Sequence, residues 1–135
     1  YFDERALEGF SKWMSKQSKE EIEHSNEFYN YVLKRNGKVE FFALDKPRMD
    51  FKSVKEVFEA TLAHEEAVTA AIEKIHKLAR ELGDYGAEVF LNKFAEEQEE
   101  EEEQVQKIID KIVSLDIDNN SATLYLLDKE MGARE

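Results

Sequence analysis

The sequence predicts an all-α fold built from a bundle of long helices. Three stretches carry apolar residues at alternating spacings of four and three, and this spacing places them along one face of a helix. The chain has 135 residues and contains one Pro and five Gly, so little interrupts a long helix. Its length suits a single domain covering residues 1–135.

The first helix is expected over residues 6–34. Asn36-Gly37 follows it and supplies a stop, because both residue types accept the left-handed backbone conformation that ends many helices. Residues 38–52 are expected to be extended, since Pro47 forbids a continuing helix.

Two more long helices and a short last helix follow this connection. Ser53 is expected to cap the second helix, Gly83 to turn the chain into the third helix, and Ser121 to cap the last one. The predicted ranges are 53–82, 85–115 and 122–131.

Helix lengths predict the order in which the helices run. A helix of about 28 residues is roughly 42 Å long, and a connection of about 16 residues can reach roughly 53 Å when extended. The first two helices can therefore be parallel, whereas the short turn at Gly83 makes the second and third antiparallel. We expect an up-up-down-down four-helix bundle with one long crossover, of which this chain supplies three long helices.

The composition excludes several classes of partner. Charged residues make up 37% of the chain and the net charge is −12, which argues against nucleic acids and anionic membranes. The absence of cysteine removes disulfides and thiolate metal sites. The sequence contains neither an apolar run of about 20 residues nor a signal-peptide pattern at its start. We expect a soluble, cytoplasmic protein.

Metal-ligand residue types replace apolar ones near the middle of each stripe. Glu21 and His24 interrupt the first stripe, Glu65 the second, and Gln98 and Glu101 the third. Bare carboxylates are expensive to bury unless cations or hydrogen bonds compensate them. Carboxylate and imidazole ligands suit iron, zinc or manganese, so the pattern predicts a metal site. A purely hydrogen-bonded buried network is the alternative.

A second Glu-x-x-His pair, Glu73 and His76, has the same spacing as Glu21 and His24. Neither residue lies on the apolar stripe of its helix. We therefore expect both on a solvated face, without a role in metal binding.

Residues 96–103 contain seven glutamates in eight positions. Such a run is usually a solvated face, but like charges four residues apart on a helix repel one another. Glu97, Glu100 and Glu101 lie on adjoining faces, so a further cation between them and Glu20 is a second prediction.

Five short segments match a known family. They are Leu7-Glu8-Gly9-Phe10, Glu20-Glu21-Ile22-Glu23-His24, His64-Glu65-Glu66, Glu97-Gln98-Glu99-Glu100-Glu101 and Leu124-Tyr125-Leu126-Leu127-Asp128-Lys129-Glu130. Through these segments the chain resembles the bacterial-type non-haem ferritins from Phe2 to Gly132. The long crossover is also typical of the ferritin-like fold.

The resemblance implies an iron-storage protein with ferroxidase activity. In this interpretation two Fe(II) ions bind at a di-iron centre, O2 or peroxide oxidises them, and Fe(III) mineral is stored in a homo-oligomeric shell, a 24-mer. The short last helix would lie at a symmetry axis of that shell. No haem is implied, because Gln98 is followed by Glu101 rather than by the second Glu-x-x-His of bacterioferritins. The implied ligands of the di-iron centre are Glu21, His24, Glu65, Gln98 and Glu101, and those of a third iron are Glu20, Glu97, Glu100 and Glu101.

Two departures from the family pattern accompany the resemblance. Tyr1-Phe2-Asp3 resembles the loop after the family's first helix, so that helix, with a ligand Glu and a nearby Tyr, is expected to be absent from this chain. Lys93 stands where bacterial members often have Trp. The alternative functions are a non-catalytic helical interaction module, or a helix-deleted ferritin fragment with an acidic metal-binding face. A di-iron oxygenase or peroxidase would need a substrate pocket that the sequence does not indicate.

Overall fold

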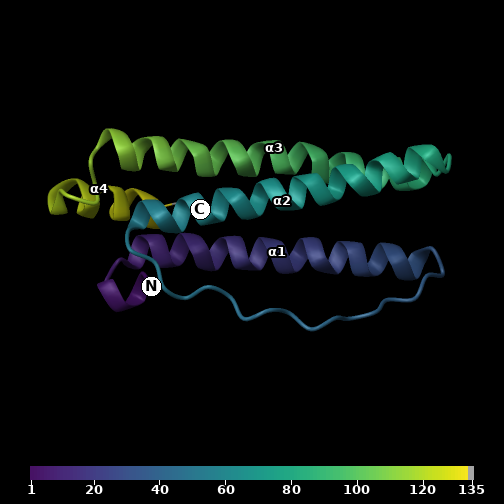
Figure 1. Ribbon diagram of the computed structural model, residues 1–135, viewed down its shortest axis with the longest axis horizontal. Helices are drawn as coiled ribbons and strands as arrows, with labels where there is room; N and C mark the ends of the chain where they lie inside the picture. The colour runs from purple at the N-terminus through teal and green to yellow at the C-terminus, as the bar shows by residue number, and fades with distance from the viewer. Residues whose placement is uncertain (134–135) are drawn as a thin grey trace. The chain divides into compact units, whose positions relative to one another are not determined.

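The computed structural model describes residues 1–133, which contain helices and no strand. The helices divide between two compact units (Figure 1). One unit comprises residues 1–50 and the segment that begins at Ser121, and the other comprises residues 51–120. The single-domain prediction stays a prediction. The elements are η1 (Asp3–Arg5), α1 (Glu8–Lys34), α2 (Val54–Glu81), α3 (Tyr85–Ser114) and α4 (Ser121–Gly132).

The predicted helices are confirmed to within one residue at every end except the start of the first. Asp3–Arg5 form a short 3-10 helix, and Ala6 closes it in the left-handed conformation with φ 55°. This backbone conformation cannot continue into an α-helix. Helix α1 therefore begins at Glu8, and the predicted start at residue 6 was wrong by two residues.

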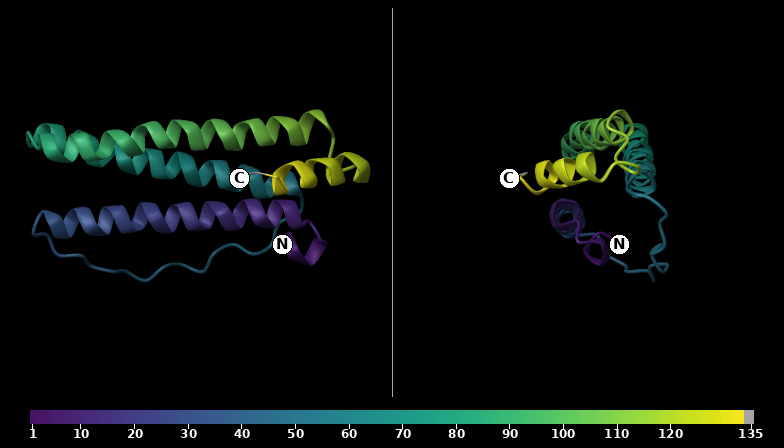
Figure 2. Two further views of the ribbon diagram at one scale, coloured as in Figure 1. Left: turned by 180° about the vertical axis from the view of Figure 1, so that it is seen from behind. Right: turned by 90° about the vertical axis from the view of Figure 1, so that its left-hand side faces the viewer.

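In the first unit, the end of α1 and the connection after it behave as the sequence predicts. Asn36 takes φ 57°, and the amide of Gly37 donates to the carbonyl of Val32 over 2.9 Å. Residues 38–50 then run without regular secondary structure back toward the N-terminal end of α1 (Figures 1 and 2). The rings of Tyr29 and Phe41 stack at 6.3 Å near the start of this connection.

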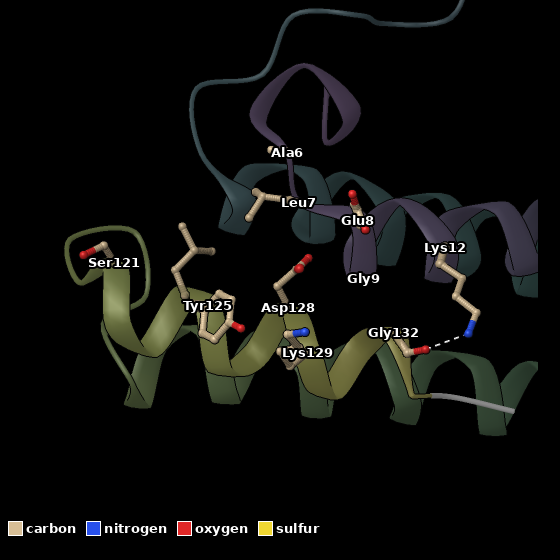
Figure 3. A pocket seen from close by; sticks show the side chains of 11 residues that line it. Ala6, Leu7, Glu8, Gly9, Lys12, Ser121, Tyr125, Asp128, Lys129 and Gly132 are labelled. Atoms are coloured by element: carbon tan, nitrogen blue, oxygen red, sulfur yellow. Dashed lines mark hydrogen bonds between the residues drawn. The ribbon is translucent and has the colours of Figure 1, made fainter.

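Helix α4 packs against the first turns of α1 (Figure 3). The Asp128 carboxylate of α4 accepts a hydrogen bond from the Phe10 amide at the start of α1 over 3.0 Å. Lys12 donates from Nζ to the carbonyl of Gly132 over 2.7 Å. Asp128 therefore acts as a cap for α1, because the first amides of a helix have no partner inside the helix. Leu127 and Met131 are the buried side chains of α4.

The second unit is an antiparallel hairpin of α2 and α3, joined at Gly83 with φ 65° (Figure 1). Ser53 caps α2 by accepting from the Glu56 amide, and Asp84 caps α3 by accepting from the Ala87 amide. Phe58, Leu91, Val105 and Ile112 are among its buried side chains.

The apolar stripes of α2 and α3 are confirmed over most of their length, with two exceptions. Ile75 is 47% exposed and Leu115 is 42% exposed, although each continues the four-and-three spacing, three residues after the buried Ile72 and Ile112. A strict repeat of four and three residues averages 3.5, and a straight helix with 3.6 residues per turn drifts away from it. Leu115 also lies beyond the last residue of α3, where it serves as the C-cap.

Asp118, which follows α3 in the chain, caps the N-terminal end of α2. Its Oδ1 accepts from the Val54 amide over 3.0 Å, and its Oδ2 accepts from the Lys55 amide over 3.4 Å. Replacing Asp118 with Ala should lower the free energy of unfolding by about 1 kcal/mol, because two helix amides lose their acceptor. Asp118→Asn retains one acceptor and should lose less. Urea unfolding followed by circular dichroism measures both variants, and equal loss would contradict the capping role.

Candidate metal centre

Helix α1 presents three of the predicted ligands within two turns. The Nδ1 atom of His24 lies 3.8 Å from Oε2 of Glu21, and both side chains are half-buried. Glu20 is also half-buried and lies 4.0 Å from Nζ of Lys16. The three-residue spacing thus brings Glu21 and His24 together on one side of α1, as predicted.

Glu65 of α2 and Gln98 of α3 meet inside the second unit. Glu65 is 4% exposed and Gln98 is 2% exposed, so both predicted interior positions are confirmed. Gln98 donates from Nε2 to Oε2 of Glu65 over 3.3 Å, and to the carbonyl oxygen of Glu65 over 3.3 Å. Two polar side chains, each near the middle of a long helix, therefore contact each other in the interior of the second unit.

An ionised carboxylate at this buried position keeps its negative charge, because a neutral amide donor does not neutralise it. Hydrogen bonds from an amide stabilise a carboxylate, but they leave its negative charge in a region of low polarity. The exposed imidazole of His64 lies at the edge of this position, with Nδ1 3.9 Å from Oε1 of Glu65. The donor chemistry of Glu65, with two carboxylate oxygens, fits a hard cation such as iron.

Thr69 and Glu102 extend the buried pair, and the sequence analysis missed both. The Thr69 hydroxyl accepts from Nε2 of Gln98 over 3.4 Å and donates to Oε1 of Glu102. Glu102 is half-buried, although the acidic run was expected to be a solvated face. The spacing was an available signal, because Thr69 follows Glu65 by one helical turn and Glu102 follows Gln98 by one turn.

The ligands predicted for a third iron differ in exposure. Glu101 is half-buried and Glu100 is exposed. Glu97 is half-buried, with Oε1 3.6 Å from Nζ of Lys93 and a buried Oε2. These three glutamates follow one another along α3, and Glu20 belongs to the other compact unit.

The structure groups the predicted ligands by unit. Among residues 1–133, no three His, Asp or Glu side chains form a group that could hold a metal ion. Glu20, Glu21 and His24 belong to the first unit, and Glu65, Glu97, Gln98, Glu100 and Glu101 belong to the second. The complete ligand sets therefore stay predictions.

The second Glu-x-x-His pair lies apart from the buried pair on α2. Glu73 is exposed, as predicted. His76 is half-buried, and its Nε2 lies 2.9 Å from Oδ1 of Asn92 on α3, in a contact that is exposed to solvent. The first turns of α3 pass close enough to α2 to provide this partner.

A cavity of about 500 Å³ lies between the start of α1 and α4 (Figure 3). Leu7, Lys12, Tyr125, Asp128 and Lys129 are among its lining residues. It contains none of the predicted ligands, and its mixed lining does not resemble a metal centre.

Comparison with known proteins gives a consistent result. The family model of the ferritin-like domain matches residues 1–115. A bacterial non-heme ferritin of Staphylococcus aureus strain USA300 is 38% identical over 134 residues, which are 99% of this chain and 80% of the relative. The corresponding protein of Staphylococcus haemolyticus is 37% identical over the same shares of both chains.

Solved structures agree with the sequence relatives. An open pore ferritin from the hyperthermophilic archaeon Archaeoglobus fulgidus matches with a TM-score of 0.96 and 33% identity, covering 100% of this chain and 82% of that one. A closed form of the same archaeal protein, engineered by site-directed mutagenesis, matches with a TM-score of 0.95 and 34% identity. These similarities confirm the all-α fold class and the resemblance found in the sequence.

Proposed function

Because the chain belongs to the ferritin family, we propose that it stores iron and oxidises Fe(II) at carboxylate-rich ligands. The observation that carries this proposal is the buried pair of Glu65 and Gln98, which places a carboxyl group in the interior of the α2–α3 hairpin. A bound cation stabilises the ionised form of a buried carboxyl group, and iron is the cation that the bacterial and archaeal relatives suggest.

The chemistry of the ligands supports oxidation rather than binding alone. Carboxylates stabilise Fe(III) more than Fe(II), which makes the loss of an electron easier. Each Fe(II) ion gives up one electron, and dioxygen takes an electron pair and two protons to leave as hydrogen peroxide. Peroxide can serve as the oxidant in the same way, with water as the product.

The proposed roles follow the sequence pattern and the family. Glu21 bridges two iron ions, His24 binds one of them and Glu65 binds the other. Gln98 positions the oxidant or a water molecule, and Glu101 passes iron between sites. A third iron ion would use Glu20, Glu97, Glu100 and Glu101.

Anaerobic Fe(II) binding followed by exposure to air tests this function. Stopped-flow absorbance should show a fast oxidation phase that saturates at about two iron ions per subunit, as expected for a di-iron carboxylate centre. The control is the same Fe(II) solution without protein. Oxidation no faster than in buffer would contradict the ferroxidase assignment.

One observation favours the non-catalytic alternative. Glu65, Gln98, Thr69 and Glu102 hydrogen-bond to one another, as expected for a polar network that specifies helix pairing. That alternative predicts no saturable Fe(II) binding at these residues, so the Fe(II) titration separates the two functions.

Assembly and location are further parts of the proposal. We propose a homo-oligomeric 24-mer shell on the basis of ferritin family membership. Within residues 1–133, no helix has both the length and the apolar character that a membrane span requires. The cytoplasmic location stays a prediction from the composition.

A further inference from the structure

Thr69 links two side chains of α3 through one hydroxyl group. Its Oγ1 accepts from Nε2 of Gln98 and donates to Oε1 of Glu102. A threonine hydroxyl has a single hydrogen, so donation to Glu102 leaves only its lone pairs for Gln98. The direction of both hydrogen bonds is therefore set by chemistry.

This direction decides which way the Gln98 amide points. Three acceptors surround Nε2: Oε2 of Glu65, the carbonyl oxygen of Glu65 and the Thr69 hydroxyl. None of the three can donate to an amide oxygen in this arrangement, so the NH2 group must face them. Two amide hydrogens serve three acceptors, which explains why the contacts are 3.3 to 3.4 Å long.

We propose that Thr69 and Glu102 are positioning residues that hold the Gln98 amide in this orientation. With the NH2 group held by α2, Oε1 is left as the atom available to an iron ion, a bound water or the oxidant. Carboxamide binds hard cations through its oxygen, so a reversed amide would offer the wrong atom. This inference rests on the proposed function, in which Gln98 takes part in iron oxidation.

The hydrogen bonds that orient the Gln98 amide matter most when iron is bound. In the proposed centre the Glu65 carboxylate binds iron, so its oxygens are less available to the amide. The Glu65 carbonyl and the Thr69 hydroxyl do not depend on the metal. Thr69 in turn is held by Glu102, which keeps the hydroxyl hydrogen away from Gln98.

Cobalt(II) provides a test that needs no turnover, because its visible absorption bands report the ligands around the ion. Thr69→Val keeps the branched shape but removes the hydroxyl, and its Co(II) spectrum should shift toward that of Gln98→Ala. Thr69→Ser restores the hydroxyl and should return the spectrum to that of the wild type. Glu102→Ala should shift the spectrum in the same direction as Thr69→Val.

Matched controls address general effects of the substitutions. Thr61→Val removes another half-buried hydroxyl of α2, which donates to the Val57 carbonyl over 3.0 Å. Glu99→Ala removes an exposed charge from the same acidic run. Neither control should change the Co(II) spectrum.

Stopped-flow kinetics with Fe(II) give a second readout. Thr69→Val should lower the rate constant of the fast oxidation phase about tenfold, the effect usual for a residue that orients a metal ligand. The number of Fe(II) ions bound per subunit should stay that of the wild type. A residue that only supports the fold would instead lower the number of bound ions together with the melting temperature.

The outcomes separate this inference from the proposed function. If the wild type neither binds Co(II) nor accelerates Fe(II) oxidation, the proposed function fails and this inference fails with it. If the wild type does both and Thr69→Val matches it, only the positioning role is overturned. It is also overturned if Thr69→Ser behaves as Thr69→Val, or if Glu102→Ala matches the wild type. If Co(II) binds without Fe(II) oxidation, the spectra alone decide.

Discussion

Replacing Glu21 or His24 with Ala is expected to slow Fe(II) oxidation by about 100-fold or more. Each variant removes a proposed ligand itself, whereas Thr69→Val removes only a residue that positions a ligand. Glu21 and His24 lie 3.8 Å apart on one side of α1. Removing Glu21 takes away the bridging carboxylate, and removing His24 takes away the one imidazole of the proposed centre. Stopped-flow absorbance and an anaerobic Fe(II) titration measure both losses.

The chain contains its own control for this experiment. Glu73→Ala and His76→Ala change the same residue types at the same spacing on α2. Glu73 is exposed, and His76 is bound to Asn92 on α3. These variants should oxidise Fe(II) at the wild-type rate, although His76→Ala gives up a contact between helices. If both pairs lose activity equally, the assignment of Glu21 and His24 as ligands is wrong.

Gly9→Ala is expected to displace α4 from α1 and to lower the stability of the first unit by about 3 kcal/mol, the upper end for overpacking in a core. A Cβ atom at Gly9 would lie 1.7 Å from the carbonyl oxygen of Asp128 and 2.9 Å from the amide nitrogen of Gly132. Both are backbone atoms, so no side-chain rotation relieves the clash. Movement of α4 also breaks the hydrogen bonds from Phe10 to Asp128 and from Lys12 to Gly132.

Thermal unfolding and limited proteolysis detect this displacement. The melting temperature should fall, and trypsin should cleave after Lys129 faster than in the wild type, because α4 leaves its support. Gly86→Ala, at an exposed position in the first turn of α3, is the control and should keep or raise the melting temperature. Unchanged cleavage at Lys129 in Gly9→Ala would show that α1 and α4 are not held as closely as described.

The proposed oxidation of iron and the packing of α4 against α1 depend on different residues of the chain. The proposed ligands lie on α1, α2 and α3, whereas the contact at Gly9 concerns the start of α1 and α4. Gly9→Ala should therefore lower stability without a comparable loss in the rate of Fe(II) oxidation per folded subunit. Measuring both properties in one preparation distinguishes a failure of folding from a failure of chemistry.

Local patterns explain which parts of the fold the sequence could predict. The helix ends depend on residues within one turn of each end, such as Ser53 before α2 and Gly83 after it. The burial of Glu65 and Gln98 followed from their place in the apolar stripes, since residues three and four apart share one face of a helix. The start of α1 was missed because Ala6 gives no local signal for its left-handed conformation.

The sequence by itself determined the helices, their buried faces and the residue types that those faces carry, because all of these depend on spacing along the chain. Only the tertiary structure decided which side chains meet: Asp128 with Phe10, 118 residues apart, Asp118 with Val54, 64 apart, and Thr69 with Glu102, 33 apart. Such pairs depend on how two helices are rotated and aligned against each other. Successive residues point about 100° apart around a helix, so a shift of one residue in the alignment of two helices changes every pair of facing side chains. The spacing of residues within one helix does not determine that alignment.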